Sequence, residues 1–276
     1  MNSVLSTIMA SAVTDVDHAR LNAASAPHSG DWLNTPPIAS LGLKLTDDEV
    51  RISVALKLGI RACLPHNCVC GKLLDARGLH GLSCERSTPR HQRHAMSNDI
   101  IWRSIKRAQI SAHKEPTGLV SEGGKRPNGI TMIPWARGKP LAWDVTVPDT
   151  YAESHIISTS AEAAAVVKHA ATIKTTKYSD ITSIHIFYPI SIETAGSWDV
   201  QAVELWEEIG RRTTSATNDK NETMYLFQRI SMTIQRGNAL SFFFTHSRTT
   251  STKNTVAVIQ FLYIQFPVCR LCACGR

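Results

Sequence analysis

Three observations predict an α/β fold in which helices flank a mixed β-sheet. The chain has 276 residues, 43% of them hydrophobic, which is enough for a core and for one or two domains. From residue 90 onward, segments with the period of helices alternate with β-branched segments that have the period of strands. The resulting order is helix, strand, strand, strand, helix, strand, helix, helix, which is typical of a sheet covered by helices.

The first part of the chain carries one clear helix signal. Residues 1–36 are small and polar, and we expect mostly loop there. Thr46-Asp47-Asp48-Glu49 is a capping box, which predicts a helix that continues through Leu58 and stops at Gly59. The apolar face of this helix is expected to consist of Val50, Val54 and Leu58.

The remaining elements follow from the hydrophobic period. Residues 90–109 predict a helix with its isoleucines and Ala108 inward and its arginines outward. Strands are expected at 112–120, 130–134, 140–147 and 183–192, and Arg137-Gly138-Lys139 joins the second and third as a hairpin. Further helices are expected at 160–178, 200–212 and 222–235.

These elements divide the chain into four parts. They are a disordered or irregular N-terminal segment (1–40), a helix with a cysteine and histidine knuckle (41–86), the α/β domain (87–243) and an irregular tail (244–276). The tail contains Cys269, Cys272 and Cys274, which we interpret as chance sequence rather than as a metal site.

The distribution of charge favours an acidic partner. The net charge is +7, and the segment from Arg86 to Lys139 holds eleven Lys or Arg against three Asp or Glu. Such a stripe is expected of a phosphate-binding surface, and equally of an ordinary solvated basic face.

Other classes of protein are disfavoured. We find no signal peptide and no run of about 18 apolar residues, so we expect an intracellular chain without a membrane partner. In a reducing compartment, clustered cysteines indicate metal more often than disulfides.

The segment 63–84 is the first candidate for chemistry. Cys68, Cys70, His80 and Cys84 offer four ligands in two pairs about ten residues apart, a pattern that can close a tetrahedral Zn²⁺ site. Cys63 and His66 are alternatives for one ligand each. The competing interpretation is a set of buried free cysteines near a chance histidine.

The second candidate is the hairpin between 128 and 146. A Mg²⁺-dependent nuclease needs two or three oxygen ligands and a cation. A hairpin can hold one ligand at the start of its first strand and another inside its second, where Asn128 and Asp144 stand. Glu115 can add a third oxygen. Lys174, Lys177 and Tyr178 follow on a helix. Taken singly, the aspartate is equally a residue that accepts backbone hydrogen bonds, and the lysines are a solvated face.

Several stretches, in order, carry a resemblance to a known family. They include "HGLSC", "RHQRHAMSNDII", "EPTGL", "GGKRPNGITMIPWARGKPLAWDVTVPDT", "FYPISIETAGSW", "EIGRR" and "LFQRISMTIQRGNALS". Over residues 15–243 the chain resembles the C-terminal region encoded by some non-LTR retrotransposons, in which a zinc knuckle and a restriction-like endonuclease of the PD-(D/E)xK type follow a reverse transcriptase. The resemblance implies a restriction-endonuclease-like fold, DNA as the partner with RNA as an alternative, structural zinc, catalytic Mg²⁺ and action in the nucleus.

Residue by residue, the resemblance assigns the knuckle ligands to Cys68, Cys70, His80 and Cys84. It assigns the second metal-binding aspartate to Asp144 and the catalytic lysine to Lys174, with Lys177 as second choice. The family's first aspartate falls on Asn128, and there the match fails. Because a neutral amide binds a hard cation less well than a carboxylate, we expect cleavage that is weak or absent.

The basic segment supplies the residues expected to contact DNA, which are Arg90, Arg93, Arg103, Arg107 and Arg126. The chain has no polymerase part, so it looks like a detached piece of a mobile element. The alternatives are a zinc-knuckle module that binds nucleic acid without chemistry and a gene fragment without function. Oligomeric state does not follow from the sequence.

Overall fold

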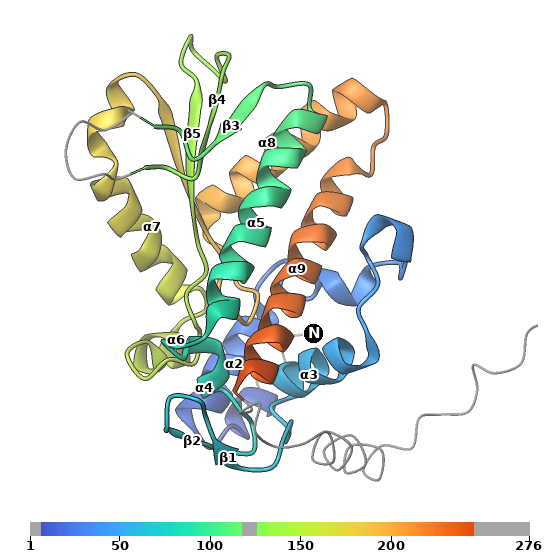
Figure 1. Ribbon diagram of the computed structural model, residues 1–276, viewed down its shortest axis with the longest axis vertical. Coiled ribbons are helices and arrows are strands. Elements are labelled where there is room, and N and C mark those ends of the chain that lie inside the picture. The colour runs from blue at the N-terminus through green and yellow to red at the C-terminus, as the bar shows by residue number, and fades with distance from the viewer. Residues whose placement is uncertain (1–6, 118–125, 246–276) are drawn as a thin grey trace, which may run out of the picture.

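The computed structural model describes residues 7–117 and 126–245 (Figure 1). Its α-helices are α2 (Asp15–Ser25), α3 (Asp47–Leu58), α4 (His80–Ser83), α5 (Thr88–Arg107), α6 (Ile156–Ala161), α7 (Ala165–Lys177), α8 (Val200–Thr217) and α9 (Glu222–Phe244). Its 3-10 helices are η1 (Asp31–Asn34), η2 (Ala39–Leu41) and η3 (Ser179–Ser183). Its strands are β1 (His66–Asn67), β2 (Leu73–Leu74), β3 (Ala112–Lys114), β4 (Gly129–Thr131), β5 (Leu141–Thr146) and β6 (Ile186–Ser191).

The main sheet is mixed, which confirms the predicted α/β class. Its order is β3-β4-β5-β6, with antiparallel pairing between the first three strands and parallel pairing between β5 and β6. A parallel pair needs a crossover connection, and α6 and α7 supply it. In Figure 1, α7 lies on one side of the sheet, and α5, α8 and α9 lie on the other.

Strand β5 is buried on both faces, and its side chains alternate between two cores. Leu141, Trp143 and Val145 enter the large core formed with α5, α8 and α9. Ala142 packs with Tyr178 and other residues on the α7 side. Because side chains in a strand alternate with a period of two, Asp144 belongs to the α7 side. The predicted strand at 140–147 therefore points its acidic residue away from the large core.

The predicted hairpin between β4 and β5 is confirmed. Ala136 and Lys139 form a bridge, and Arg137 and Gly138 between them both have positive φ, 50° and 74°. Two such residues make the tight turn that matches the twist of the flanking strands. Position 129, at the start of β4, requires glycine for a steric reason, because a Cβ there would lie 2.0 Å from Cζ2 of Trp143.

Helix α9 connects the two ends of the molecule. Along one part it contacts α5 and α8, and along the other it contacts α3, α4 and η1. Its Ala239 and Phe242 pack in a second core with residues of 52–82. The knuckle segment and the sheet thus share one long helix, which is buried along most of its length.

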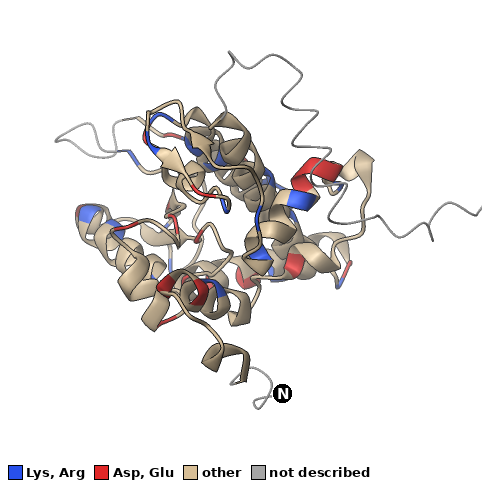
Figure 2. Cartoon of the chain, turned by 90° about the horizontal axis from the view of Figure 1, so that it is seen from below, with Lys and Arg blue, Asp and Glu red and all other residues tan. Residues whose placement is uncertain are grey.

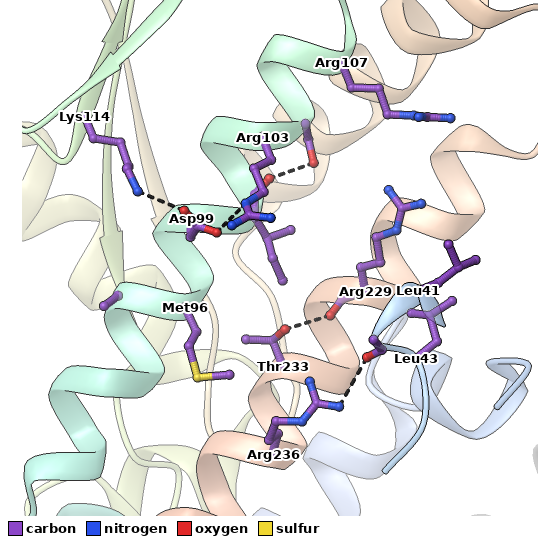
Figure 3. A pocket seen from close by; sticks show the side chains of 14 residues that line it. Leu41, Leu43, Met96, Asp99, Arg103, Arg107, Lys114, Arg229, Thr233 and Arg236 are labelled. Carbon is purple, nitrogen blue, oxygen red and sulfur yellow. Dashed lines mark hydrogen bonds and ion pairs between the residues drawn. The ribbon is translucent and has the colours of Figure 1, made fainter. Parts of the chain in front are cut away.

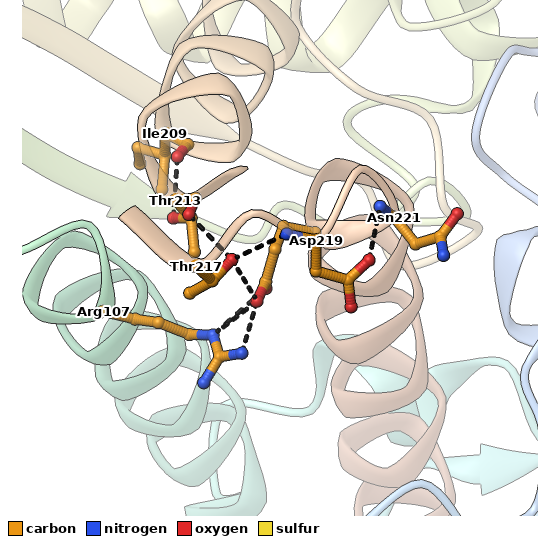
Figure 4. A network of polar contacts seen from close by, with 7 residues as sticks. Arg107, Ile209, Thr213, Thr217, Asp219 and Asn221 are labelled. Carbon is orange, nitrogen blue, oxygen red and sulfur yellow. Dashed lines mark hydrogen bonds and ion pairs between the residues drawn. The ribbon is translucent and has the colours of Figure 1, made fainter. Parts of the chain in front are cut away.

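A polar network ties the end of α5 to the turn between α8 and α9 (Figure 4). Arg107 Nε donates to both carboxylate oxygens of Glu222, at 3.0 and 3.1 Å. Glu222 is 3% exposed, and Thr217 also donates to it at 3.3 Å. A paired and hydrogen-bonded carboxylate is the form in which a buried charge is tolerated.

The prediction of mostly loop over residues 1–36 is wrong, because Asp15–Ser25 is helix α2. The Thr14 side chain caps it by accepting a hydrogen bond from the N–H of Asp17 at 3.2 Å. Its small residues form the buried stripe, since Ala19 and Ala23 are buried. Asn22 Nδ2 donates to the carbonyls of Thr159 and Ser160, at 3.1 and 2.8 Å, so α2 is held against α6. The N-terminal segment that we expected to be disordered or irregular is therefore ordered and packed from residue 15 onward.

Two helix predictions need correction in detail. The capping box of α3 is confirmed, with Thr46 and Glu49 each bonded to the other's backbone. Its buried face, however, is Ile52, Ser53, Ala55 and Leu56, and not the expected valines and leucine. The single helix expected over 160–178 is two helices, since Ala164 has a positive φ of 62° and interrupts it.

The strand expected over 112–120 is shorter. It ends at Lys114, where Glu115 takes a positive φ of 49°; residues 118–120 of that prediction lie outside the described part. The tail cysteines also lie outside it. Within the described residues, no helix combines the length and apolar character needed to cross a membrane.

The Arg107–Glu222 pair yields a first prediction. Glu222→Gln keeps the side chain's size but removes the charge that two nitrogens of Arg107 approach. Hydrogen bonds to charged groups contribute about 1.5–3 kcal/mol, so we expect the free energy of unfolding to fall by about that amount in urea titrations. Glu207→Gln, at an exposed position on α8, is the control and should change it by less than about 0.5 kcal/mol. Equal losses in both variants would contradict the role of the pair.

Candidate metal centre and strand aspartate

The four predicted knuckle residues meet at one point. The β1–β2 ribbon carries Cys68 and Cys70 in its turn, where Gly71 N donates to the Cys68 carbonyl at 2.7 Å. His80 begins α4, and Cys84 follows the end of that helix. The four ligand atoms all lie within 4.8 Å of one another. The structure therefore confirms a cluster that can hold a metal ion.

The spacing within the cluster suits a tetrahedral ion. Cys68 Sγ and Cys84 Sγ are 3.6 Å apart, and Cys70 Sγ is 3.1 Å from His80 Nε2. A zinc ion with thiolates at about 2.3 Å and imidazole at about 2.0 Å requires ligand atoms about 3.5–3.8 Å apart. The separation of the two sulfurs matches such an edge, the separation of sulfur and nitrogen is shorter, and all the ligand atoms lie within 4.8 Å of one another.

The two alternative ligands have other partners. The Cys63 thiol donates to the carbonyls of Asp75 and Ala76, at 3.5 and 3.7 Å, and burial raises its pKa to about 11. The ring nitrogens of His66 lie 2.9 Å from the Leu64 carbonyl and 3.0 Å from Thr245 Oγ1. Among the described residues, the metal-ligand cluster consists of the four residues first predicted.

The thiols of the cluster differ in acidity. Burial raises the pKa of Cys68, whereas the backbone N–H of Lys72 and the His80 ring lower the pKa of Cys70 to about 6. Thiolates are the form that binds metal. A cation at the centre would stabilise the buried thiolates, and this couples metal binding to folding.

Asp144 lies on β5, where it is 3% exposed. Its Oδ2 is 2.5 Å from Lys174 Nζ of α7. Oδ2 accepts no aligned hydrogen bond from the described residues, so the ion pair with Lys174 is what balances its charge. The two residues singled out by sequence are therefore brought together across the space between strand and helix.

Asn128 faces Asp144 across the hairpin but is engaged elsewhere. The register pairs Gly129 with Trp143, which places residue 128 opposite residue 144, and directly opposed residues share a face of the sheet. The Asn128 Oδ1 accepts a hydrogen bond from the N–H of Val145 at 2.6 Å. What remains at the end of the side chain is the amino group, a donor that does not ligate cations.

Glu115, Lys177 and Tyr178 are the other residues that the sequence analysis places at this site. Glu115 N donates to the carbonyl of Asn128 at 3.0 Å, so residues 115 and 128, just beyond the ends of β3 and β4, continue the row to Asp144 on β5. The Glu115 side chain is exposed. Tyr178 donates to the Arg126 carbonyl at 2.7 Å. Burial and the charge of Asp144 raise the pKa of Tyr178 to about 12. Lys177 is exposed over the Tyr178 ring, which makes Lys174 the lysine at the site.

The five arginines that were predicted to contact DNA differ in their exposure and in their partners. Arg93 is 1% exposed and donates to Asn238 Oδ1 at 2.9 Å and to the Leu82 carbonyl at 3.2 Å, so its assignment to a DNA contact is wrong. Arg107 is committed to Glu222. Arg103 pairs with Asp99 at 2.6 Å yet is 72% exposed, and Arg90 and Arg126 are exposed. In Figure 2, basic and acidic positions both occur on several elements of the chain.

Two residues that the sequence did not single out support this region. Asn98 Oδ1 accepts from Trp143 Nε1 at 2.8 Å, and its Nδ2 donates to the Asn128 carbonyl at 3.2 Å. Glu193, after β6, is 1% exposed. Burial raises the pKa of Glu193 to about 7, and hydrogen bonds from Thr150 and the backbone of Val166 limit the rise. No local motif marks either residue, because the partners of Asn98 and the burial of Glu193 come from segments far away in the sequence.

Comparison with known proteins adds no relative: the search of protein-family models and the search of curated proteins both found no match to this chain.

Glu193 gives a prediction on pH. Its pKa is about 7 in the folded chain against an ordinary value of 4.5, so the folded state binds more protons between these values. Its contribution to stability is therefore complete below about pH 4.5 and is lost as pH rises through about 7. Glu193→Gln should gain about 1–3 kcal/mol relative to the parent between about pH 5 and about pH 8, as measured by urea titrations. Parallel pH curves for parent and variant would contradict this, and Glu207→Gln should stay parallel.

Proposed function

We propose that this chain is the remnant of a retrotransposon endonuclease region that binds DNA and cleaves it weakly or not at all. The resemblance of the sequence motifs to that region is the starting point. Three features of the structure support the proposal: a mixed sheet flanked by helices, the cysteine and histidine cluster, and an aspartate inside a strand that is paired with a lysine. A restriction-endonuclease-like fold fits this arrangement.

The proposal that DNA cleavage is impaired rests on the charge at the strand site. Asp144 contributes one negative charge, and the Lys174 ammonium at 2.5 Å cancels it. Asn128 adds no charge, and its oxygen is engaged by the Val145 N–H. Mg²⁺ is held by carboxylates and other oxygens and gives up its water reluctantly. A site with a net charge near zero attracts the ion poorly, whereas an aspartate at 128 would leave it negative.

If Mg²⁺ were held here, Asp144 would be its ligand, and the ion would stabilise charge on the phosphate during cleavage. Lys174 would then be released from the carboxylate and stand beside the same phosphate. Its ammonium is suited to steady a leaving or attacking oxygen. Glu115 is the remaining acid in the row, and its exposed side chain is the least constrained of the three.

The knuckle is proposed to hold structural zinc. All four positions are filled by protein ligands, the arrangement found in structural rather than catalytic zinc sites. The segment between β1 and α4 has short strands and a small core of its own, so an ion would add much of its stability.

Binding of DNA is proposed to use exposed basic residues, including Arg90, Arg103 and Arg126. Contacts of this kind release counterions, so affinity falls steeply with salt. The same absence of charge at the strand site also favours the second candidate function, a module that binds DNA or RNA without chemistry. Action in the nucleus follows from the resemblance alone.

Plasmid nicking tests the impairment. With Mg²⁺ or Mn²⁺, the parent chain should nick supercoiled plasmid slowly or not at all. Asn128→Asp should increase the rate by at least about tenfold, since the added carboxylate improves metal binding by about 1.4 kcal/mol or more, and Asp144→Ala in that background should remove the gain. Robust nicking by the parent chain that disappears in Asp144→Ala would overturn the proposal of impaired cleavage.

Metal analysis tests the knuckle. The purified chain should contain one zinc ion, and Cys84→Ser should lose it together with part of the stability, because a structural zinc ion contributes directly to folding. Cys63→Ser is the matched control, since its thiol bonds to carbonyls outside the cluster, and it should keep the zinc. Loss of zinc in both variants, or in neither, would contradict the assignment of ligands.

A further inference from the structure

A groove between α5 and α9 belongs to neither site described above (Figure 3). Its volume is about 690 Å³, and the segment at 41–43 closes one side of it. This volume falls within the range of about 300–1,000 Å³ in which proteins bind small ligands. The groove brings together three segments that are far apart in the sequence.

The side chains around the groove are mainly basic. Five cations line it, Arg103, Arg107, Lys114, Arg229 and Arg236, against one acid, Asp99. Asp99 itself accepts ion pairs from Arg103 and Lys114, at 2.6 and 2.8 Å, and these partners lower its pKa although burial opposes them. Even when Glu222 and Glu49, which pair with Arg107 and Arg236, are included, the cations remain in excess.

Arg229 is the groove cation that remains available to pair with an anionic ligand. Arg236 is occupied by the carbonyls of Gly42 and Lys44, at 3.2 and 3.1 Å, and so fastens the segment that closes the groove. Among the residues that the structure describes, none forms an ion pair with the guanidinium of Arg229. In Figure 3, Arg103 of α5 turns toward Asp99, whereas Arg229 extends from α9 and no dashed line reaches its guanidinium. A guanidinium placed in this way matches the geometry of a phosphate.

Most of the remaining lining is apolar, with Ser104 and Thr233 as its polar members. Leu41 is 56% exposed at the mouth, and Ala95, Met96 and Ile100 follow along α5. A ligand that fits must therefore carry an anionic group and a flat or apolar body of similar size. A nucleotide has both. In a duplex the bases are stacked and paired inward, whereas a single strand exposes them to a protein surface.

We propose that this groove binds a nucleotide of single-stranded nucleic acid, with a backbone phosphate at Arg229 and the base against Leu41, Met96 and Ile100. The inference rests on the proposed function in that the partner is nucleic acid. It adds a second place of contact, because α5 and α9 lie on the side of the sheet opposite to α7 and Asp144. The described residues that line the groove include no aromatic ring, so little preference among bases is expected.

Fluorescence anisotropy tests the groove with a labelled thymidine strand of about 12 nucleotides, a length that a single-strand groove spans. Arg229→Ala should weaken binding by about tenfold, the value of one charged phosphate contact. It should also reduce the slope of log affinity against log salt by about 0.7. Leu41→Asp, which places a carboxylate at the mouth, should weaken binding as well. Arg211→Ala on α8 removes the same charge at an exposed position outside the groove and should change affinity by less than about twofold.

The outcomes separate the two proposals. If the parent chain binds neither the strand nor a duplex, the proposed function and the groove both fail. If it binds the strand but Arg229→Ala and Arg211→Ala weaken it equally, the groove alone fails. Thymidine monophosphate that binds as tightly as the strand would assign the groove to a free nucleotide and overturn the strand as ligand. Loss of strand binding confined to the groove variants supports the inference.

Discussion

The indole of Trp143 fixes the relative positions of three elements. Its Nε1 donates to Asn98 on α5, its ring covers Gly129 at the start of β4, and its own strand lies at the centre of the sheet. Asn98 completes the arrangement by donating to the carbonyl of Asn128. A fully buried aromatic with a satisfied N–H is a strong constraint. Because β5 alternates, orienting Trp143 toward α5 orients Asp144 toward Lys174.

A second constraint joins the knuckle to the sheet. Arg93 of α5 is buried and donates to the carbonyl of Leu82, which lies between the candidate ligands His80 and Cys84. It also donates to Asn238 of α9, whose own amide donates to Thr194 after β6 at 2.7 Å. Burial lowers the pKa of Arg93 to about 10. The knuckle is therefore tied to α9 and to the segment after β6 through hydrogen-bonded side chains, and not only through the backbone.

Local signals in the sequence predicted the elements that depend on local interactions. The capping box at Thr46, the hairpin turn at Gly138 and the β-rich run of β5 depend on neighbouring residues, so composition and turn chemistry reveal them. Helix α2 was missed because its buried residues, Ala19, Leu21 and Ala23, are mostly small, so the segment shows no clear apolar stripe. The interior position of Arg93 depends on Asn238, and the groove depends on 41–43, α5 and α9. Contacts over such distances leave no local pattern.

The hydrogen bond between Asn128 and Val145 shows what the fold requires at position 128. The backbone N–H of Val145 needs one oxygen from that side chain, and the amide provides it without adding a negative charge beside Asp144. A carboxylate of the same shape can accept the same hydrogen bond, so the backbone path of the hairpin does not distinguish between the two side chains. The choice between amide and acid therefore sets the electrostatic potential of the hairpin and leaves its geometry unchanged.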